Sequence, residues 1–446
     1  MKKHRTLKYI CAALAAAGAL LALFAFADRA WLLRRADSSD QRVAVRKFPY
    51  PYRSMASLSS DCDGVSIESF EQYHRFLNTH EDTQYGTGIG LDVADSFWVY
   101  SASENYGELM TYCLGLDPGA PKDAAAIKKY VECGWIDSIH AMGEFSEFGG
   151  GETKFTRSLA LSAWDGLLRD GISPIVWIDH GNEGNVQNFG SYSPFNSSKY
   201  QRGDDRRSAA YYHADATLAG GIKYVWHSRH SDRHAFDFPL AVRTLRDGQN
   251  VWAFSRYTSV VVNGAIQWRW HPDALWLEIT EDKLSALAEN WQYGMFAQHF
   301  AYYGADHKYS GKDIKALRLL QNWQDDKEEI LVARTSRLLE YATMQKYVEY
   351  EAAITDTLPR RGVTSINVLA IRDPLFPDSS PDVERLRGLT FYCDEPAYAM
   401  ILVNGARVDE HEITRNEADS TGRKSISIKW HEPDRNDYTR ADGFSQ

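Results

Sequence analysis

Strand-like and helix-like segments alternate along most of the chain, and this rhythm constrains the fold more than any other feature. Short apolar runs typical of buried strands cover 92–100, 135–140, 174–180, 222–226 and 295–303. Runs with the spacing of amphipathic helices cover 67–78, 122–133, 159–170, 208–219, 284–293, 313–323 and 335–351. Strands that alternate with helices pair in parallel, because each helix carries the chain back across the sheet. We therefore predict an α/β fold, a closed or nearly closed (β/α) barrel, over residues 56–360.

The pattern changes after residue 361. Short strand-like runs at 364–371, 389–393, 399–403 and 424–430 are separated by Pro, Asp, Asn and Gly, and Asn404-Gly405 favours a hairpin turn. This spacing predicts a small antiparallel β domain over 361–435. A polar tail, expected to fray, follows over 436–446.

The first residues carry an export signal. Lys2, Lys3, Arg5 and Lys8 precede an uncharged run, Tyr9 to Ala27, that is long enough to cross a bilayer. Residues 1–35 are therefore predicted to be either a membrane anchor or a signal peptide cleaved after Ala27, with 36–55 as a linker. Either way, the protein is expected on the outer side of the cell membrane, or in the periplasm or medium. A bridge between Cys113 and Cys133 is possible there.

Polar side chains follow several predicted strands. Asp61 and Asp63 end a short strand-like run that begins at Leu58, His140 and His180 end two later strands, and His299 lies within the predicted strand 295–303. Side chains at the carboxyl ends of parallel strands meet at one edge of a barrel. Carboxylates and imidazoles together suit zinc or a similar divalent ion. A turn rich in Asp, with Gly64 supplying a positive φ, is the alternative explanation of the aspartate pair.

These segments resemble motifs of the polysaccharide deacetylase (NodB-homology) superfamily, which are metal-dependent carbohydrate esterases with a distorted (β/α) barrel. Ser59 to Gly64 looks like the family's Asp-Asp motif, 136–144 like its His-x-x-x-His motif, and 298–300 like its late histidine motif. The resemblance covers about residues 56–345. It implies a divalent metal ion, zinc by preference, and a glycan substrate from which acyl groups are removed.

The chain departs from the family pattern in two places. Cys62 separates the two aspartates, so the resemblance assigns the base role to Asp61 and the ligand role to Asp63 only with a shift of one position. Glu144 stands where the family has its second histidine, and His180 either supplies the missing nitrogen or contacts substrate. The implied metal ligands are thus Asp63, His140, His180 and Glu144, with Asp61 as base and His299 as general acid.

Polar residues of the following loops are candidate substrate contacts. Asn182 and Asn188 follow the strand that ends at His180, and Asp204 lies in a polar turn. Such side chains can bind sugar hydroxyls, although loops are polar for other reasons too.

Three classes of function compete for this sequence. A deacetylase-like hydrolase requires a metal, whereas a glycoside hydrolase could use carboxylates such as Asp61, Glu144 and Asp179 without one. A glycan-binding protein with an inactive site is the third possibility. The formal net charge of −10 argues against a nucleic-acid partner.

Overall fold

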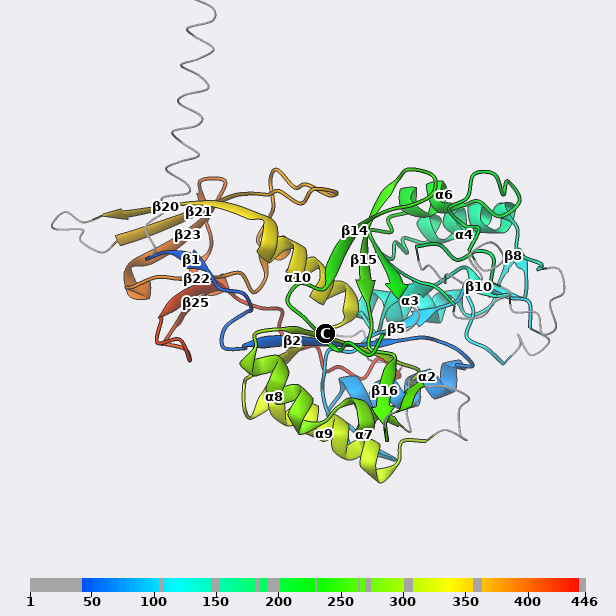
Figure 1. Cartoon of the computed structure of the whole chain (residues 1–446), viewed down its shortest axis with the longest axis horizontal. Coiled ribbons are helices and arrows are strands. Elements are labelled where there is room, and N and C mark those ends of the chain that lie inside the picture. Colours follow the sequence, from blue (N-terminus) through cyan, green and yellow to red (C-terminus); the bar gives the residue numbers. More distant parts are fainter. Residues whose placement is uncertain are drawn as a thin grey trace, which may run out of the picture.

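The protein has a mixed α/β structure with two principal sheets in its larger part. The computed structural model describes residues 42–103, 108–145, 153–180, 185–190, 201–228, 231–263, 265–268, 274–300, 308–355 and 363–440. Figure 1 shows the larger part on one side, a smaller β region on the other, and helix α10 between them.

The first principal sheet has the strand order β14-β15-β12-β11-β9-β5. Its strands are β5 (Asp95–Phe97), β9 (Ile136–His140), β11 (Val176–Ile178), β12 (Tyr224–Ser228), β14 (Leu240–Thr244) and β15 (Asn250–Ser255). All neighbours are parallel except β14 and β15. This part of the chain therefore follows the predicted parallel pairing.

The second principal sheet has the order β13-β18-β2-β19. It contains β2 (Ser54–Ser60), β13 (Ala235–Phe236), β18 (Tyr293–Gln298) and β19 (Ile330–Val332), with β2 parallel to both β18 and β19. Two isolated parallel bridges, Ser59 with Ala94 and Tyr257 with Phe296, connect this sheet to the first. At the second bridge the amide of Tyr257 donates to the carbonyl of Met295 at 2.7 Å.

Helices cover these sheets. They are α2 (Ile67–Asn78), α3 (Ala124–Cys133), α4 (Arg157–Arg169), α6 (Ala214–Ala219), α7 (Leu275–Glu278), α8 (Glu281–Glu289), α9 (Gly311–Asp325) and α10 (Thr335–Tyr347). Ser66 and Ser310 begin α2 and α9 with capping boxes, which satisfy amides that a helix start leaves free. Helix α3 packs against β9, α9 against β19, and α10 against both β2 and β9. Among the described residues, none of the helices combines the length and apolar character needed to span a bilayer.

The smaller region consists of two more sheets. One has the order β20-β21-β23-β24, from Val348–Thr355, Val363–Ile371, Ala399–Val403 and Ala406–Arg407. The other has the order β1-β22-β26-β25, from Ala44–Val45, Thr390–Tyr392, Ser425–Ile428 and Ile413–Asn416. One apolar core runs from Trp252 in the first principal sheet, through Leu338 of α10, to Phe391 in the smaller region. The two parts therefore share a core.

Short strands also pair outside these four sheets. They are β3 (Asp82–Thr83) with β4 (Gly86–Thr87), β6 (Tyr100–Ser101) with β10 (Gly143–Glu144), β7 (Cys113–Leu114) with β8 (Asp117–Pro121), and β16 (Ser259–Val262) with β17 (Ala265–Trp268).

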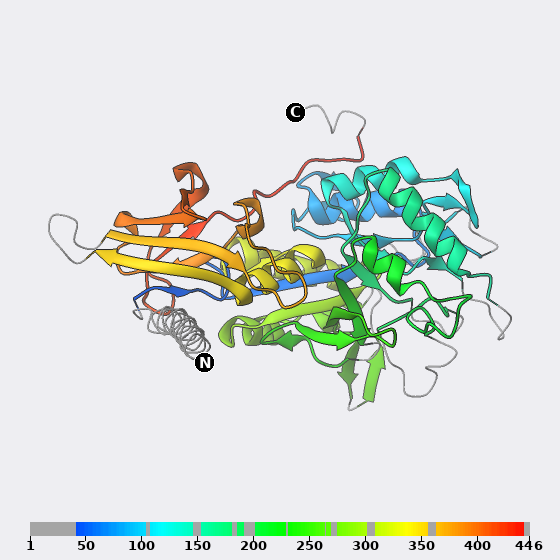
Figure 2. The same ribbon diagram turned by 90° about the horizontal axis from the view of Figure 1, so that it is seen from above.

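Several boundaries differ from the sequence-based expectation. The predicted linker 36–55 contains β1, a strand of the smaller region, and β2 already begins at Ser54. Part of the predicted tail contacts the larger part of the protein, because Asp437 accepts from Arg75 at 2.9 Å and Tyr438 packs edge-on against Trp135. Figure 2 shows this last segment running from the smaller region to helices α2 and α3.

Two further expectations can be compared with the structure. Strands β14 and β15 occupy a stretch for which no element was predicted. Cys62, Cys113, Cys133 and Cys393 are all free, so no bridge joins Cys113 to Cys133. The predicted anchor or signal peptide, residues 1–35, lies outside the described residues.

Candidate metal centre

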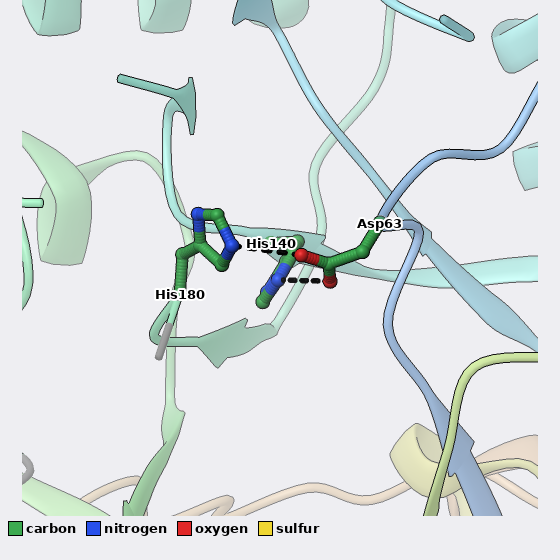
Figure 3. Close-up of side chains that lie close together, drawn as sticks. All are labelled: Asp63, His140 and His180. Atoms are coloured by element: carbon green, nitrogen blue, oxygen red, sulfur yellow. Dashed lines mark hydrogen bonds and ion pairs between the residues drawn. The ribbon is translucent and has the colours of Figure 1, made fainter. Parts of the chain in front are cut away.

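The carboxylate of Asp63 lies between two imidazoles that come from neighbouring strands. Its Oδ2 is 3.0 Å from Nε2 of His140, and its Oδ1 is 2.7 Å from Nε2 of His180 (Figure 3). Register explains the meeting, because His140 pairs with Ile178 in parallel strands β9 and β11, and His180 follows two residues later. Gly64, with φ of 66°, turns the chain directly after Asp63.

Neighbouring groups fix the position of both histidines. Nδ1 of His140 lies 3.2 Å from the carbonyl oxygen of Ile178 and donates its proton to it, because a carbonyl oxygen can only accept, and Nε2 is the nitrogen that faces Asp63. The side chain of Asn188 binds both backbone groups of His180, at 2.5 Å to the carbonyl and 3.3 Å to the amide. The indole of Trp98 packs against both rings, with centroids 6.0 Å from His140 and 5.6 Å from His180.

The donor set fits a divalent cation. One carboxylate and two imidazole nitrogens, from Asp63, His140 and His180, lie within 4.8 Å of one another. Zinc sites use this mixture of oxygen and nitrogen ligands, and the hydrogen bond from His140 Nδ1 to a backbone carbonyl is typical of a metal-binding histidine. Buried acidic and imidazole groups here can therefore hold a metal ion.

The charges of the site also fit a cation. Burial opposes ionisation of Asp63, but His180 and His140 hold its pKa well below the usual range. Burial likewise disfavours a charged His180, yet Asp63 and then Glu144 raise its pKa to about 9. His180 consequently keeps a positive charge beside the Asp63 carboxylate, which shows that this carboxylate favours a cationic neighbour.

Asp61 has a different partner. Its Oδ1 and Oδ2 accept from Nη1 and Nη2 of Arg256, at 2.5 and 3.0 Å, and Arg256 follows directly after β15. The guanidinium also lies 4.3 Å from the ring of Trp226 and donates to the carbonyl of Ser59 at 3.3 Å. Burial would raise the pKa of Asp61, but Arg256, with smaller effects of His140 and His299, lowers it. Asp61 is thus kept as a carboxylate.

His299 closes the cluster on the side of β18. Its Nε2 lies 3.2 Å from Oδ2 of Asp63 and 3.9 Å from Oδ2 of Asp61, which makes a second group of mutually close ligand atoms. Because Arg256 binds both oxygens of Asp61, the first group is the better cation site. His299 is then the imidazole that faces both aspartates.

The structure brings together Asp61, Asp63, His140, His180 and His299 as the sequence suggested. Glu144 belongs to neither group of ligand atoms, and its Oε2 lies instead 3.6 Å from Nδ1 of His180. Asn182 lies outside the described residues.

Two predicted substrate contacts have structural partners. The side chain of Asn188 is fully buried and binds the backbone of His180 with both of its polar atoms. Asp204 is also buried, and its carboxylate binds the backbone amide and guanidinium of Arg246, with Oδ1 2.8 Å from Nε. We therefore assign these residues to the support of the site and of its neighbouring loop.

Sequence reasoning missed Arg256 and Trp98. Arg256 follows the apolar run Val251 to Phe254, so the same strand-end rule that indicated the histidines applied to it. Trp98 follows β5 directly, but nothing in its sequence context indicates that its ring faces two histidines. No protein-family model and no curated protein matches this chain.

Proposed function

We propose that the chain is a metal-dependent hydrolase related to the polysaccharide deacetylases, which removes acyl groups from a cell-envelope or extracellular glycan. One observation carries the proposal: two aspartates two residues apart have different partners. Asp63 faces two imidazoles, whereas Asp61 is held by a guanidinium outside that group. A hydrolytic site needs this separation, because a carboxylate that ligates the cation is a poor base.

The strand connections support a barrel of the deacetylase type. With the two isolated bridges included, β2, β5, β9, β11, β12, β15 and β18 follow one another in a ring of parallel pairs. In this proposal the ring is a distorted (β/α) barrel. Asp61, His140, His180, Arg256 and His299 then stand at the carboxyl ends of its strands, where such barrels carry their active sites.

The residues have distinct roles in the proposed reaction. A divalent cation, zinc in this proposal, would polarise the acyl carbonyl and make a water more acidic. Asp61 accepts a proton from the water as the water oxygen bonds to the acyl carbon, since Arg256 keeps the carboxylate ionised. His299 donates a proton to the leaving nitrogen or oxygen as the acyl bond breaks, a role that suits an imidazole near neutral pH. The products are a carboxylic acid and a free amine or hydroxyl on the sugar.

The glycan and the compartment rest on the sequence. The proposed location outside the cytoplasm, by membrane anchor or secretion, depends on residues 1–35, and the glycan on the family resemblance. A glycoside hydrolase ranks second, because its general acid must be protonated while the pKa of Asp61 is lowered. Asp179 is also engaged, since its Oδ1 accepts from Trp177 at 2.7 Å and from the amide of Phe189 at 3.1 Å.

Metal content tests this function first. We expect the purified full-length chain to bind one equivalent of zinc or a similar ion, measured by elemental analysis, and Asp63→Ala and His140→Ala to lose it. Asp61→Asn should retain the metal but release acetate from acetylated glycans about 100-fold or more slowly, the usual effect of removing a general base. Glycan cleavage without metal would instead support the glycosidase, and glycan binding without turnover would support the inactive protein.

A further inference from the structure

Nδ1 of His180 is the ring atom that points away from Asp63. Its partner atom in the ring, Nε2, lies 2.7 Å from Oδ1 of Asp63. A neutral imidazole that binds a cation through one nitrogen carries its proton on the other. If Nε2 binds the cation, Nδ1 must therefore donate a hydrogen bond, and an acceptor is needed on that side of the ring.

Two side chains approach Nδ1. The amide nitrogen of Asn185 is 3.0 Å away, and Oε2 of Glu144 is 3.6 Å away. The orientation of the Asn185 amide is fixed by its oxygen, which accepts from the amide of Phe145 at 3.4 Å and from Gln187 at 3.2 Å. An NH₂ group can only donate. It suits an unprotonated Nδ1, whereas the carboxylate of Glu144 suits a protonated one.

The backbone around Glu144 is held in place. Strand β10 pairs with β6, and the carbonyl of Glu144 accepts from the amide of Ala102 at 2.7 Å. The side chain of Gln187 binds the amide of Met142 at 2.8 Å and the carbonyl of Gly143 at 2.7 Å. These contacts fix the backbone of β10 and keep the carboxylate of Glu144 on the Nδ1 side of the His180 ring.

Gly143 permits the close approach of β10 to β6. Its φ is 142°, and a Cβ atom there would lie 2.0 Å from the carbonyl oxygen of Tyr100. Only glycine therefore allows β10 to lie against β6 at this point, and that contact brings Glu144 to the back of His180.

We propose that Glu144 is a positioning residue, whose carboxylate accepts the Nδ1 proton of His180 and so fixes the tautomer that presents Nε2 to the cation. The inference rests on the metal site of the proposed function. It gives the carboxylate four residues after His140 a task other than ligation, because the second nitrogen ligand comes from the neighbouring strand. His140 follows the same arrangement with the carbonyl of Ile178 as its acceptor.

Metal affinity tests the role of Glu144 without relying on activity. In the full-length chain, Glu144→Ala should weaken Zn²⁺ binding about 10- to 100-fold, the usual effect of removing such a partner, as measured by competition with a chelating indicator. Glu144→Gln keeps an oxygen acceptor and should restore most of the affinity. The absorption bands of bound Co²⁺ should stay unchanged in both variants, since the ligands are the same. Glu132→Gln, an exposed carboxylate on α3, is the matched control and should bind as wild type.

Each other result overturns the inference. Wild-type affinity in Glu144→Ala would show that the carboxylate does nothing for His180. Co²⁺ bands altered in the same way as in His180→Ala would show that Glu144 is itself a ligand. Equal losses in the Gln and Ala variants would exclude an acceptor role. A wild-type chain that binds neither ion would refute the proposed function itself, and the inference with it.

Discussion

Two buried arginine–aspartate pairs, one in each part of the molecule, have different surroundings. Arg46 binds Asp419 through Nε at 2.8 Å and also donates to backbone carbonyls, among them Phe48 at 2.8 Å and Pro51 at 2.9 Å. Arg256 binds Asp61 through both terminal nitrogens. Both guanidinium groups are almost completely shielded from solvent. The chemistry of each pair is the same, but the other contacts differ.

Under the proposed function, these surroundings separate a structural pair from one that takes part in the reaction. Arg46 holds the turn after β1 against the smaller region, and Asp419 also accepts from the hydroxyl of Tyr392 at 2.7 Å. Asp61 instead lies 3.9 Å from His299. Burial of a charge pair is therefore weak evidence of function, and the groups that the carboxylate faces carry more information.

Arg46→Met should produce the largest effect. The substitution leaves a buried carboxylate and several carbonyls without their donor, and breaking such a pair costs about 3–5 kcal/mol. Urea unfolding should show this loss of stability, while the protein that remains folded should bind zinc as wild type. A loss below about 1 kcal/mol would mean that water replaces the guanidinium, and the pair would not be structural.

Arg256→Lys should affect the reaction more than the fold. Lysine keeps the charge but cannot bind both oxygens of Asp61 in a fork, so the pKa of Asp61 should rise. We expect acetate release to fall about 100-fold at neutral pH and the acid limb of its pH profile to move upward, with zinc affinity unchanged. Arg46→Lys is the matched control and should leave the profile in place. An unchanged profile in Arg256→Lys would remove Asp61 from the role of base.

The sequence indicated the ligands better than their supports. Asp63, His140 and His180 were found because they follow predicted strands, and strand ends in a parallel sheet share one edge, a rule that needs no knowledge of tertiary contacts. Asn188 was predicted to bind substrate, but its amide satisfies the backbone of His180. Which group an amide side chain binds depends on how a loop folds back, and local sequence does not contain that information.

The fold likewise contains elements that a local sequence pattern predicts and elements that it does not. The α/β rhythm predicted the parallel strands, while β1 was assigned to a linker because a strand of two residues has no periodicity to detect. Strand β15 is more instructive. Its run Asn250–Ser255 has an apolar centre, but no strand was predicted there, so the strand-end rule did not reach the arginine that follows it.

Two histidines should give the smallest effects, with opposite dependence on pH. In the metal-free protein, the raised pKa of His180, about 9 against an ordinary 6.5, means that its contribution to stability is complete below pH 6.5 and is lost as pH rises towards 9. His431 borders a cavity of about 510 Å³ between the two parts. Burial, and then Arg337, lower its pKa to about 4, so its contribution is lost as pH falls from 6.5 towards 4.

Substitution of either histidine should remove only its own contribution to the pH dependence of the free energy of unfolding. We expect changes on the order of 1–2 kcal/mol in the free energy of unfolding across each pH range, after allowance for solvent screening. His180→Asn should flatten only the alkaline side of the stability curve, and His431→Gln only the acid side, both measured by urea unfolding at fixed ionic strength. Saturating zinc should also flatten the alkaline side of the wild type, because a ligating Nε2 no longer takes up a proton. An alkaline slope that persists with zinc bound would show that His180 is not a ligand, and would leave Asp63 and His140 too few to hold the ion.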